Sequence, residues 1–192
     1  ALALILCVPV LPALAEPVSF RNKAEALKYI EKNHPTELTL ENVKLKPTEL
    51  LEIKQALPEG ATFHFTTKWG TVTFSDDAEE VDLRSKKNLA NISELEAIVG
   101  ICPNVKVIDN SKNTSLNSKA MVPLIEKYPD IRFEWVVDLG KGYKVSTRAT
   151  AYSTFKHVSS GQRLKSEDLE QLKYCPRLKA LDLGHHDIKS LI

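Results

Sequence analysis

The 192-residue chain lacks an excess of charge of either sign, because 26 Lys and Arg side chains are balanced by 25 Asp and Glu side chains. Without a surface field of one sign, nothing in the composition would steer the protein onto phosphate backbones or acidic lipid. We therefore expect no nucleic-acid partner. The hydrophobic fraction of 43% is ordinary for a globular protein and argues against disorder.

The sequence also lacks the common motifs of catalytic and cofactor sites. Residues 140–142 (Gly-Lys-Gly) have no preceding spaced glycine, and the serines in 159–161 are not in a Gly-x-Ser-x-Gly context. The adjacent pair His185 and His186 has no Cys or further His at ligand spacing, and the acidic run 76–80 lacks the spaced oxygens and central glycine of a calcium loop. We expect no catalytic residue, no metal and no cofactor.

The first fifteen residues carry no charge and consist almost wholly of Leu, Ile, Val and Ala. This run is shorter than the roughly 20 apolar residues that a membrane-spanning helix needs. It ends at residues 13–15 (Ala-Leu-Ala), which have the small-x-small form that signal peptidase cleaves. We therefore expect residues 1–15 to be a secretory signal that begins within a longer precursor, and the mature protein to be secreted or at the cell surface with no stable membrane span. The alternative, a buried strand or helix, is disfavoured by Pro9 and Pro12.

Internal similarity indicates a repeat protein. Ser, Glu, Cys, Pro and Lys recur together in residues 93–106 and 166–179, with the two cysteines 73 residues apart. Short apolar runs that predict strands begin near Leu38, Thr62, Val81, Val105, Ile131, Phe155 and Leu178. Nearly all the steps between them fall in the 20–29-residue period of leucine-rich repeats.

The connections between these runs predict two kinds of element. Short amphipathic helices are expected over 47–57, 91–101, 118–128 and 166–174, each followed within two residues by a proline that returns the chain to a strand. Residues 71–74 and 143–147 alternate apolar and polar side chains and predict second short strands. An amphipathic helix over 22–33 is expected to cover the first repeat as a cap.

The last apolar run carries a family pattern. Residues 178–188 fit L-x-x-L-x-L-x-x-N-x-L, with His186 in the asparagine place. This segment, with Cys-Pro leading into it, resembles exported bacterial leucine-rich repeat proteins. The resemblance implies an α/β fold, a leucine-rich-repeat-like solenoid with parallel strands, short helices and an N-terminal helical cap, and it places Leu181 and Leu183 in the core. The repeats are irregular, because Asn113 occupies the asparagine place whereas Val43, Lys86 and His186 occupy the comparable places elsewhere.

The expected organisation is a signal over residues 1–15, a helical cap over 16–35 and a repeat region over 36–192. This region stops inside an apolar run and is expected to continue in the parent protein. Cys102 and Cys175 lead into the fourth and seventh strands, about 14 Å apart at about 4.8 Å per strand. A disulfide needs Cα atoms within about 7 Å, so we expect two separate buried thiols.

A stacked array of repeats exposes one extended face, which such proteins use for binding. By this analogy we expect a non-catalytic scaffold whose partner is a protein or a cell-envelope glycan. The alternatives are the targeting or substrate-binding region of a larger exported enzyme whose catalytic domain lies outside this chain, and a purely structural spacer. The strand-face residues expected to line the binding surface are Thr39, Glu41, His64, Thr66, Asp82, Arg84, Glu134 and Asp182.

Overall fold

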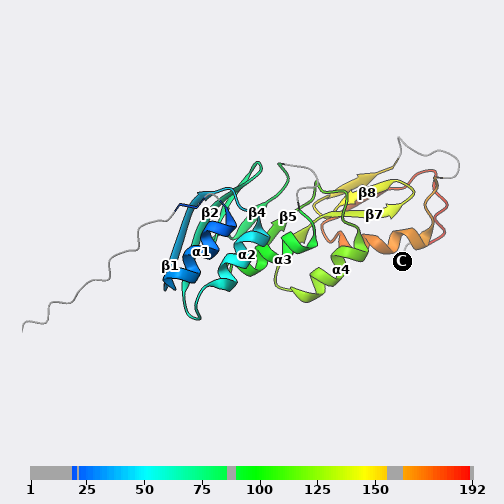
Figure 1. Ribbon diagram of the computed structural model, residues 1–192. Coiled ribbons are helices and arrows are strands. Elements are labelled where there is room, and N and C mark those ends of the chain that lie inside the picture. The colour runs from blue at the N-terminus through cyan, green and yellow to red at the C-terminus, as the bar shows by residue number, and fades with distance from the viewer. Residues whose placement is uncertain (1–18, 21, 86–89, 155–161, 191–192) are drawn as a thin grey trace, which may run out of the picture.

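The computed structural model describes residues 19–20, 22–85, 90–154 and 162–190 (Figure 1). In these ranges the protein is α/β, with five helices and several small sheets that mix parallel and antiparallel pairing. The predictions that concern the signal segment, Lys86, the strand expected near Phe155 and the serines of 159–161 fall outside the described residues.

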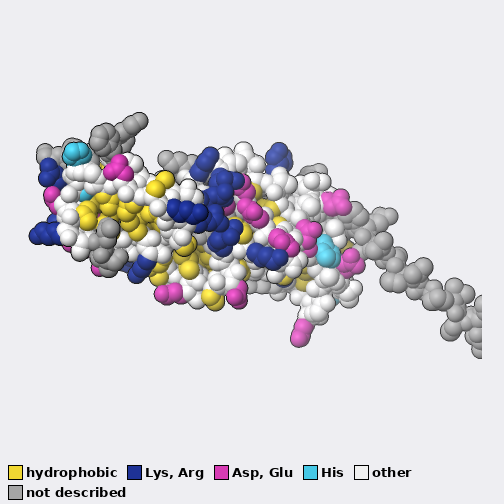
Figure 2. Space-filling view, turned by 180° about the vertical axis from the view of Figure 1, so that it is seen from behind, with side chains coloured by type: hydrophobic (Ala, Val, Ile, Leu, Met, Phe, Trp, Pro, Cys, Tyr) yellow, Lys and Arg dark blue, Asp and Glu magenta, His cyan; other side chains and the backbone are white. Residues whose placement is uncertain are grey.

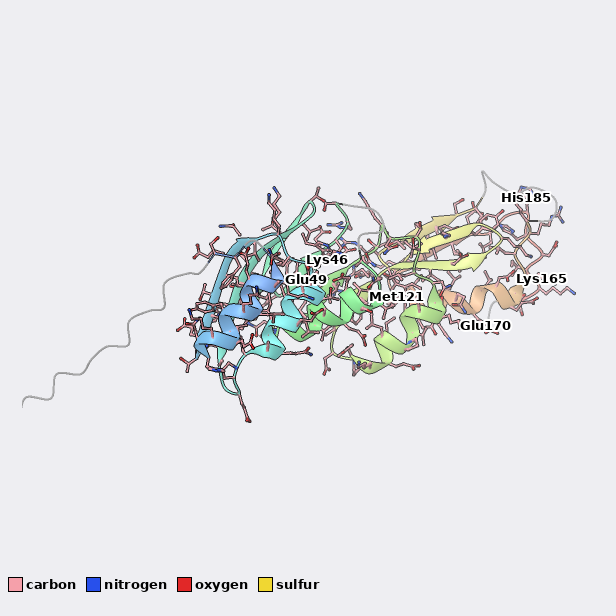
Figure 3. All side chains as sticks on the ribbon, viewed as in Figure 1. Lys46, Glu49, Met121, Lys165, Glu170 and His185 are labelled. Atoms are coloured by element: carbon pink, nitrogen blue, oxygen red, sulfur yellow. The ribbon has the colours of Figure 1, made fainter. Side chains whose placement is uncertain are left out.

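All five predicted helices are present within one or two residues of their expected bounds: α1 (Lys23–Asn33), α2 (Pro47–Ala56), α3 (Ile92–Ile101), α4 (Ser118–Lys127) and the 3-10 helix η1 (Ser166–Tyr174). Helices α1, α3 and α4 begin after Asn22, Asn91 and Asn117, whose side-chain oxygens accept the N–H three residues on at 3.1, 2.9 and 3.1 Å. At the start of α2 the Lys46 N–H donates to Glu49 Oε2 at 2.8 Å, and Figure 3 labels both residues. Consecutive helices pack on one another from α1 to α4.

The strands pair in four small sheets. Parallel pairing joins β1 (Glu37–Val43) to β2 (Thr62–Trp69), and β4 (Glu80–Asp82) to β5 (Val107–Asp109) and β6 (Arg132–Glu134). It also joins β9 (Ala151–Ser153) to β10 (Ala180–Asp182). Antiparallel pairing joins β3 (Val72–Ser75) to β2, and β7 (Val136–Gly140) to β8 (Tyr143–Ser146). Six of the seven predicted strand runs are thus strands, and the predicted second strands are β3 and β8.

The parallel strands do not form one continuous ladder in the described ranges, and the predicted solenoid is not found there. They pair in groups of two, three and two, because antiparallel hairpins interrupt the stacking. The sequence predicted a strand of each hairpin, over 71–74 and 143–147, but not that the hairpins would divide the parallel ladder. Trp135 leaves the parallel ladder after β6, its N–H donates to Thr147 Oγ1 at 3.0 Å, and the chain continues as the β7–β8 hairpin.

The core lies between the sheets and the helices. Val81, Ile108 and Phe133 occupy one register position across β4, β5 and β6, and all three are buried. Successive side chains along a strand point to opposite faces. The residues that follow these three therefore project from the other face of the sheet, away from the core.

Three polar side chains hydrogen-bond backbone groups that lie 22 to 24 residues earlier in the chain. Thr67 Oγ1 donates to the carbonyl oxygens of Val43 and Leu45 at 3.2 and 2.9 Å. Asn113 Nδ2 donates to the carbonyl oxygen of Ala90 at 2.6 Å, so this asparagine satisfies a backbone group. The third of these side chains is a histidine, His186.

His186 was predicted to break this pattern, and the structure corrects that prediction. Its Nδ1 accepts the N–H of Leu164 at 2.9 Å, so Nε2 carries the proton and donates to Thr154 Oγ1 at 2.8 Å. The imidazole thus satisfies a backbone group as an asparagine would.

The last parallel pair corrects a second prediction. Leu181 was expected in the core, but it is 36% exposed, because β10 is the last described strand and its outward side is uncovered. It lies with Leu169, Leu172 and Leu178 around an apolar hollow. Figure 2 shows hydrophobic side chains gathered at the end of the molecule farthest from α1.

Cys102 and Cys175 are both buried free thiols, as predicted. Burial raises the pKa of Cys102 to about 12 and that of Cys175 to about 11. Both side chains act as small apolar fillers where a helix turns into a strand.

Candidate functional site

The eight predicted strand-face residues lie in three separate places. Thr39, Glu41, His64 and Thr66 line one hollow of about 610 Å³ beside the β1–β2 pair. Asp82, Arg84 and Glu134 lie on or next to the three-stranded parallel sheet. Asp182 ends β10, where its carboxylate accepts hydrogen bonds from the Gly184 N–H and from Ser153 Oγ, and these bonds lower its pKa.

The hollow beside β1 and β2 uses much of its polar chemistry within the fold. His64 Nδ1 lies 2.9 Å from Asp76 Oδ2, and Asp76 Oδ1 accepts the N–H of Phe65 at 3.0 Å. Thr66 Oγ1 accepts the N–H of Asn42 at 2.8 Å. These contacts fix the edges of the strands, so we regard this hollow as the weaker candidate for a binding site.

A row of acidic residues crosses the three-stranded sheet. Asp82 on β4, Asp109 on β5 and Glu134 on β6 occupy one register position. Like charges on directly neighbouring strands repel one another. Asp109 is fully buried and Glu134 is 3% exposed, so hydration by water cannot stabilise the negative charge of either carboxylate.

Two arginines neutralise the first half of this row. Arg84 Nη2 lies 2.6 Å from Asp82 Oδ2, and Arg84 Nε lies 3.2 Å from Asp109 Oδ2. Arg148 reaches the same oxygen of Asp109 from the turn after β8. The hydrogen bond from Arg84 lowers the pKa of Asp82, and the same hydrogen bond together with the charge of Asp109 raises the pKa of Arg84. The N–H of Ser111 donates to the other oxygen of Asp109 at 3.0 Å.

Glu134 forms the second half. Its Oε2 accepts a hydrogen bond from Thr147 Oγ1 at 2.6 Å. Its Oε1 lies 3.1 Å from Arg132 Nε and 3.2 Å from Arg177 Nη2, yet neither approach has hydrogen-bond geometry. The two arginines therefore compensate the charge of Glu134 without donating a hydrogen bond to its Oε1.

We call these seven side chains the arginine–carboxylate row: Asp82, Asp109, Glu134, Arg84, Arg132, Arg148 and Arg177. Four guanidinium groups against three carboxylates give it a formal charge of +1. The carboxylates of β5 and β6 are buried, whereas the four arginine side chains are 37 to 56% exposed. Figure 2 shows Lys and Arg side chains gathered over the middle of this side of the molecule, with acidic side chains next to them. Guanidinium groups held in this way suit carboxylate, phosphate or sulfate ligands.

The sequence prediction found three members of the row and missed four. Asp109 could have been found, because an apolar residue followed by an acid recurs as Val81-Asp82, Ile108-Asp109 and Phe133-Glu134 at the matched strand positions. The other three residues that the sequence prediction missed are arginines. Arg132 precedes its carboxylate on β6, whereas Arg148 and Arg177 come from turns whose position depends on tertiary packing.

The described ranges hold no group of three His, Cys, Asp or Glu side chains placed to bind a metal ion. Of the helices in the described part of the chain, none combines the length and apolar character that a bilayer span requires. Comparisons of this chain with protein-family models, with curated proteins and with solved structures find no match.

Proposed function

We propose that this chain is a non-catalytic recognition scaffold of a secreted or cell-surface protein, built from irregular leucine-rich-type repeats, and that it binds a partner through the arginine–carboxylate row. The observation that carries the proposal is the combination of buried carboxylates and exposed guanidinium groups on one face of the parallel sheet.

Two kinds of contact support a repeat origin. The parallel pairs join positions one repeat length apart, such as Leu38 with Phe63 and Ile108 with Phe133. The side chains that tie one turn to the preceding one also reach back by about one repeat, as Asn113 does to Ala90. Both spacings fall within or close to the period of leucine-rich repeats.

The row is suited to binding because its donors are held in place before a ligand arrives. An arginine held by a buried carboxylate loses less side-chain entropy on binding than a free surface arginine does. Each guanidinium has five N–H donors, so several remain after it has contacted its carboxylate. The row therefore offers fixed hydrogen-bond donors at low entropic cost.

The test is capture of partners from a cell-envelope extract by the immobilised chain, with the captured proteins identified by mass spectrometry. The variant combines Arg132→Gln and Arg177→Gln, which removes both guanidinium groups beside the buried Glu134 and leaves Asp109 with both of its arginines. The control combines Lys28→Gln and Lys32→Gln, which remove the same charge from exposed positions of α1.

We expect the wild-type chain and the α1 control to retain the same proteins, and the row variant to lose them. Equal capture by the row variant, with an unchanged free energy of unfolding, would contradict the proposal. Capture of nothing by the wild-type chain would also count against it.

A further inference from the structure

A small pocket opens beside the second half of the arginine–carboxylate row, between β6 and the turn that follows η1. Its volume is about 230 Å³. Pockets for drug-sized molecules are usually about 300–1,000 Å³, so this one suits a single large side chain. Its apolar walls come from Ile125, Ile131, Phe133, Trp135, Tyr174 and Pro176.

The floor of the pocket contains a packed aromatic pair. Trp135 is 1% exposed, and its ring lies 5.8 Å from that of Tyr174, centroid to centroid, at a tilt of 54°. Aromatic pairs at this centroid distance contribute more than their buried area alone. The pocket is therefore a preformed apolar surface and does not depend on a partner for its shape.

The rim of the pocket is cationic. Arg132, Lys173 and Arg177 line it, and Glu134 is the single acid among its lining residues. Neither guanidinium group donates a hydrogen bond to Glu134 Oε1, although both lie within 3.2 Å of it. Their N–H groups are thus available to a carboxylate that arrives from solvent, in the forked geometry that guanidinium favours.

We propose, on the basis of the function inferred above, that the row binds an extended acidic peptide segment of a partner protein. An Asp or Glu of that segment contacts Arg132 and Arg177, and a neighbouring large apolar side chain enters the pocket. Further acidic residues of the segment reach Arg84 and Arg148 along the sheet.

A peptide accounts for both halves of this site better than other anions do. A nucleic acid or a sulfated glycan presents dense charge, whereas the row carries a formal charge of only +1, and such polyanions would leave the apolar walls unfilled. A peptide places a carboxylate and an apolar side chain within one or two residues of each other. Tyr, Trp and Arg also dominate the energetic centres of protein interfaces, and this pocket combines all three.

The experiment measures binding of a synthetic twelve-residue peptide of Glu and Ser with one central Phe, acetylated and amidated at its ends, by isothermal titration calorimetry at fixed salt. Two further peptides replace Phe with Ala, or every Glu with Gln. The protein variants are the combined Arg132→Gln and Arg177→Gln, and the α1 control Lys28→Gln and Lys32→Gln. Unfolding curves accompany each protein variant.

We expect the Phe→Ala change in the peptide to weaken binding about 10- to 100-fold, as burial of one aromatic side chain implies. The Gln peptide and the row variant should each weaken it at least about tenfold, which is typical of interface arginines, and the α1 control should leave it unchanged. An equal affinity for the Phe and Ala peptides would refute occupation of the pocket.

Two outcomes separate this inference from the proposed function. If heparin or duplex DNA binds tightly, with the same loss in the row variant, and the peptide does not, the row is a binding site but the peptide class is wrong. If neither the peptide nor these polyanions bind while capture from extract still depends on the row, the scaffold function stands and this inference fails.

Discussion

Replacing Asp109 should have the largest effect of any change in the arginine–carboxylate row. Its side chain is fully buried, Arg84 and Arg148 contact one of its oxygens, and the Ser111 N–H donates to the other. Breaking a buried ion pair typically costs about 3–5 kcal/mol. The two arginines are 37% exposed and can be hydrated after the change, which lowers the expected cost.

For Asp109→Ala we therefore expect the free energy of unfolding to fall by about 2–4 kcal/mol. Asp109→Asn keeps an oxygen that can accept from Ser111, so it should cost about 1 kcal/mol less. Urea unfolding followed by circular dichroism measures both. The comparison variant is Glu96→Gln, which removes the exposed ion pair with Lys127 and should leave the free energy of unfolding unchanged.

The salt dependence gives a further check, because water and ions do not reach the Asp109 carboxylate. The difference between wild type and Asp109→Ala should persist at high salt. A loss of less than about 0.5 kcal/mol, the usual scatter of surface substitutions, would refute the view that the row stabilises the sheet.

Three further predictions concern groups outside the row. Asn113→Ala removes the donor to a backbone carbonyl and should lower the free energy of unfolding by about 1–3 kcal/mol, measured in urea; an unchanged value would contradict the tie between turns. Burial raises the pKa of Cys102 to about 12 and that of Cys175 to about 11, so neither thiol should react with Ellman's reagent at pH 8 until the chain unfolds, and rapid native labelling would refute their burial. Burial lowers the pKa of His186, so the unfolded chain binds more protons near pH 6.5, and the free energy of unfolding should fall as the pH drops below about 6.5. His186→Asn should remove this pH dependence in unfolding curves recorded from pH 5 to 8. An unchanged pH dependence would assign it to other groups.

Local patterns determined the elements of this protein. The positions of the apolar runs, the prolines after each helix and the asparagine caps depend on residues close together in the sequence, and the helix bounds follow them within one or two residues. The alternation in residues 71–74 and 143–147 likewise specified β3 and β8. Repeat spacing also placed Asn113 correctly at its turn.

Packing decided what these elements do together. Trp135 leaves the parallel ladder because a threonine from a later turn takes its N–H, and no local pattern marks that break. Leu181 fits the repeat pattern yet is exposed, since nothing in the described ranges covers the last strand. His186 departs from the pattern yet satisfies a backbone group as an asparagine would, because its Nδ1 accepts the N–H of Leu164.

The candidate site shows the same division. The sequence could place Asp82 and Glu134 on strand faces, because alternation along a strand is local. Only the tertiary structure placed Arg148 and Arg177 beside the buried carboxylates, since each lies in a turn whose approach to the sheet depends on how the neighbouring units pack. Charge compensation of a buried group acts through space, and for that reason it is not a property of sequence spacing.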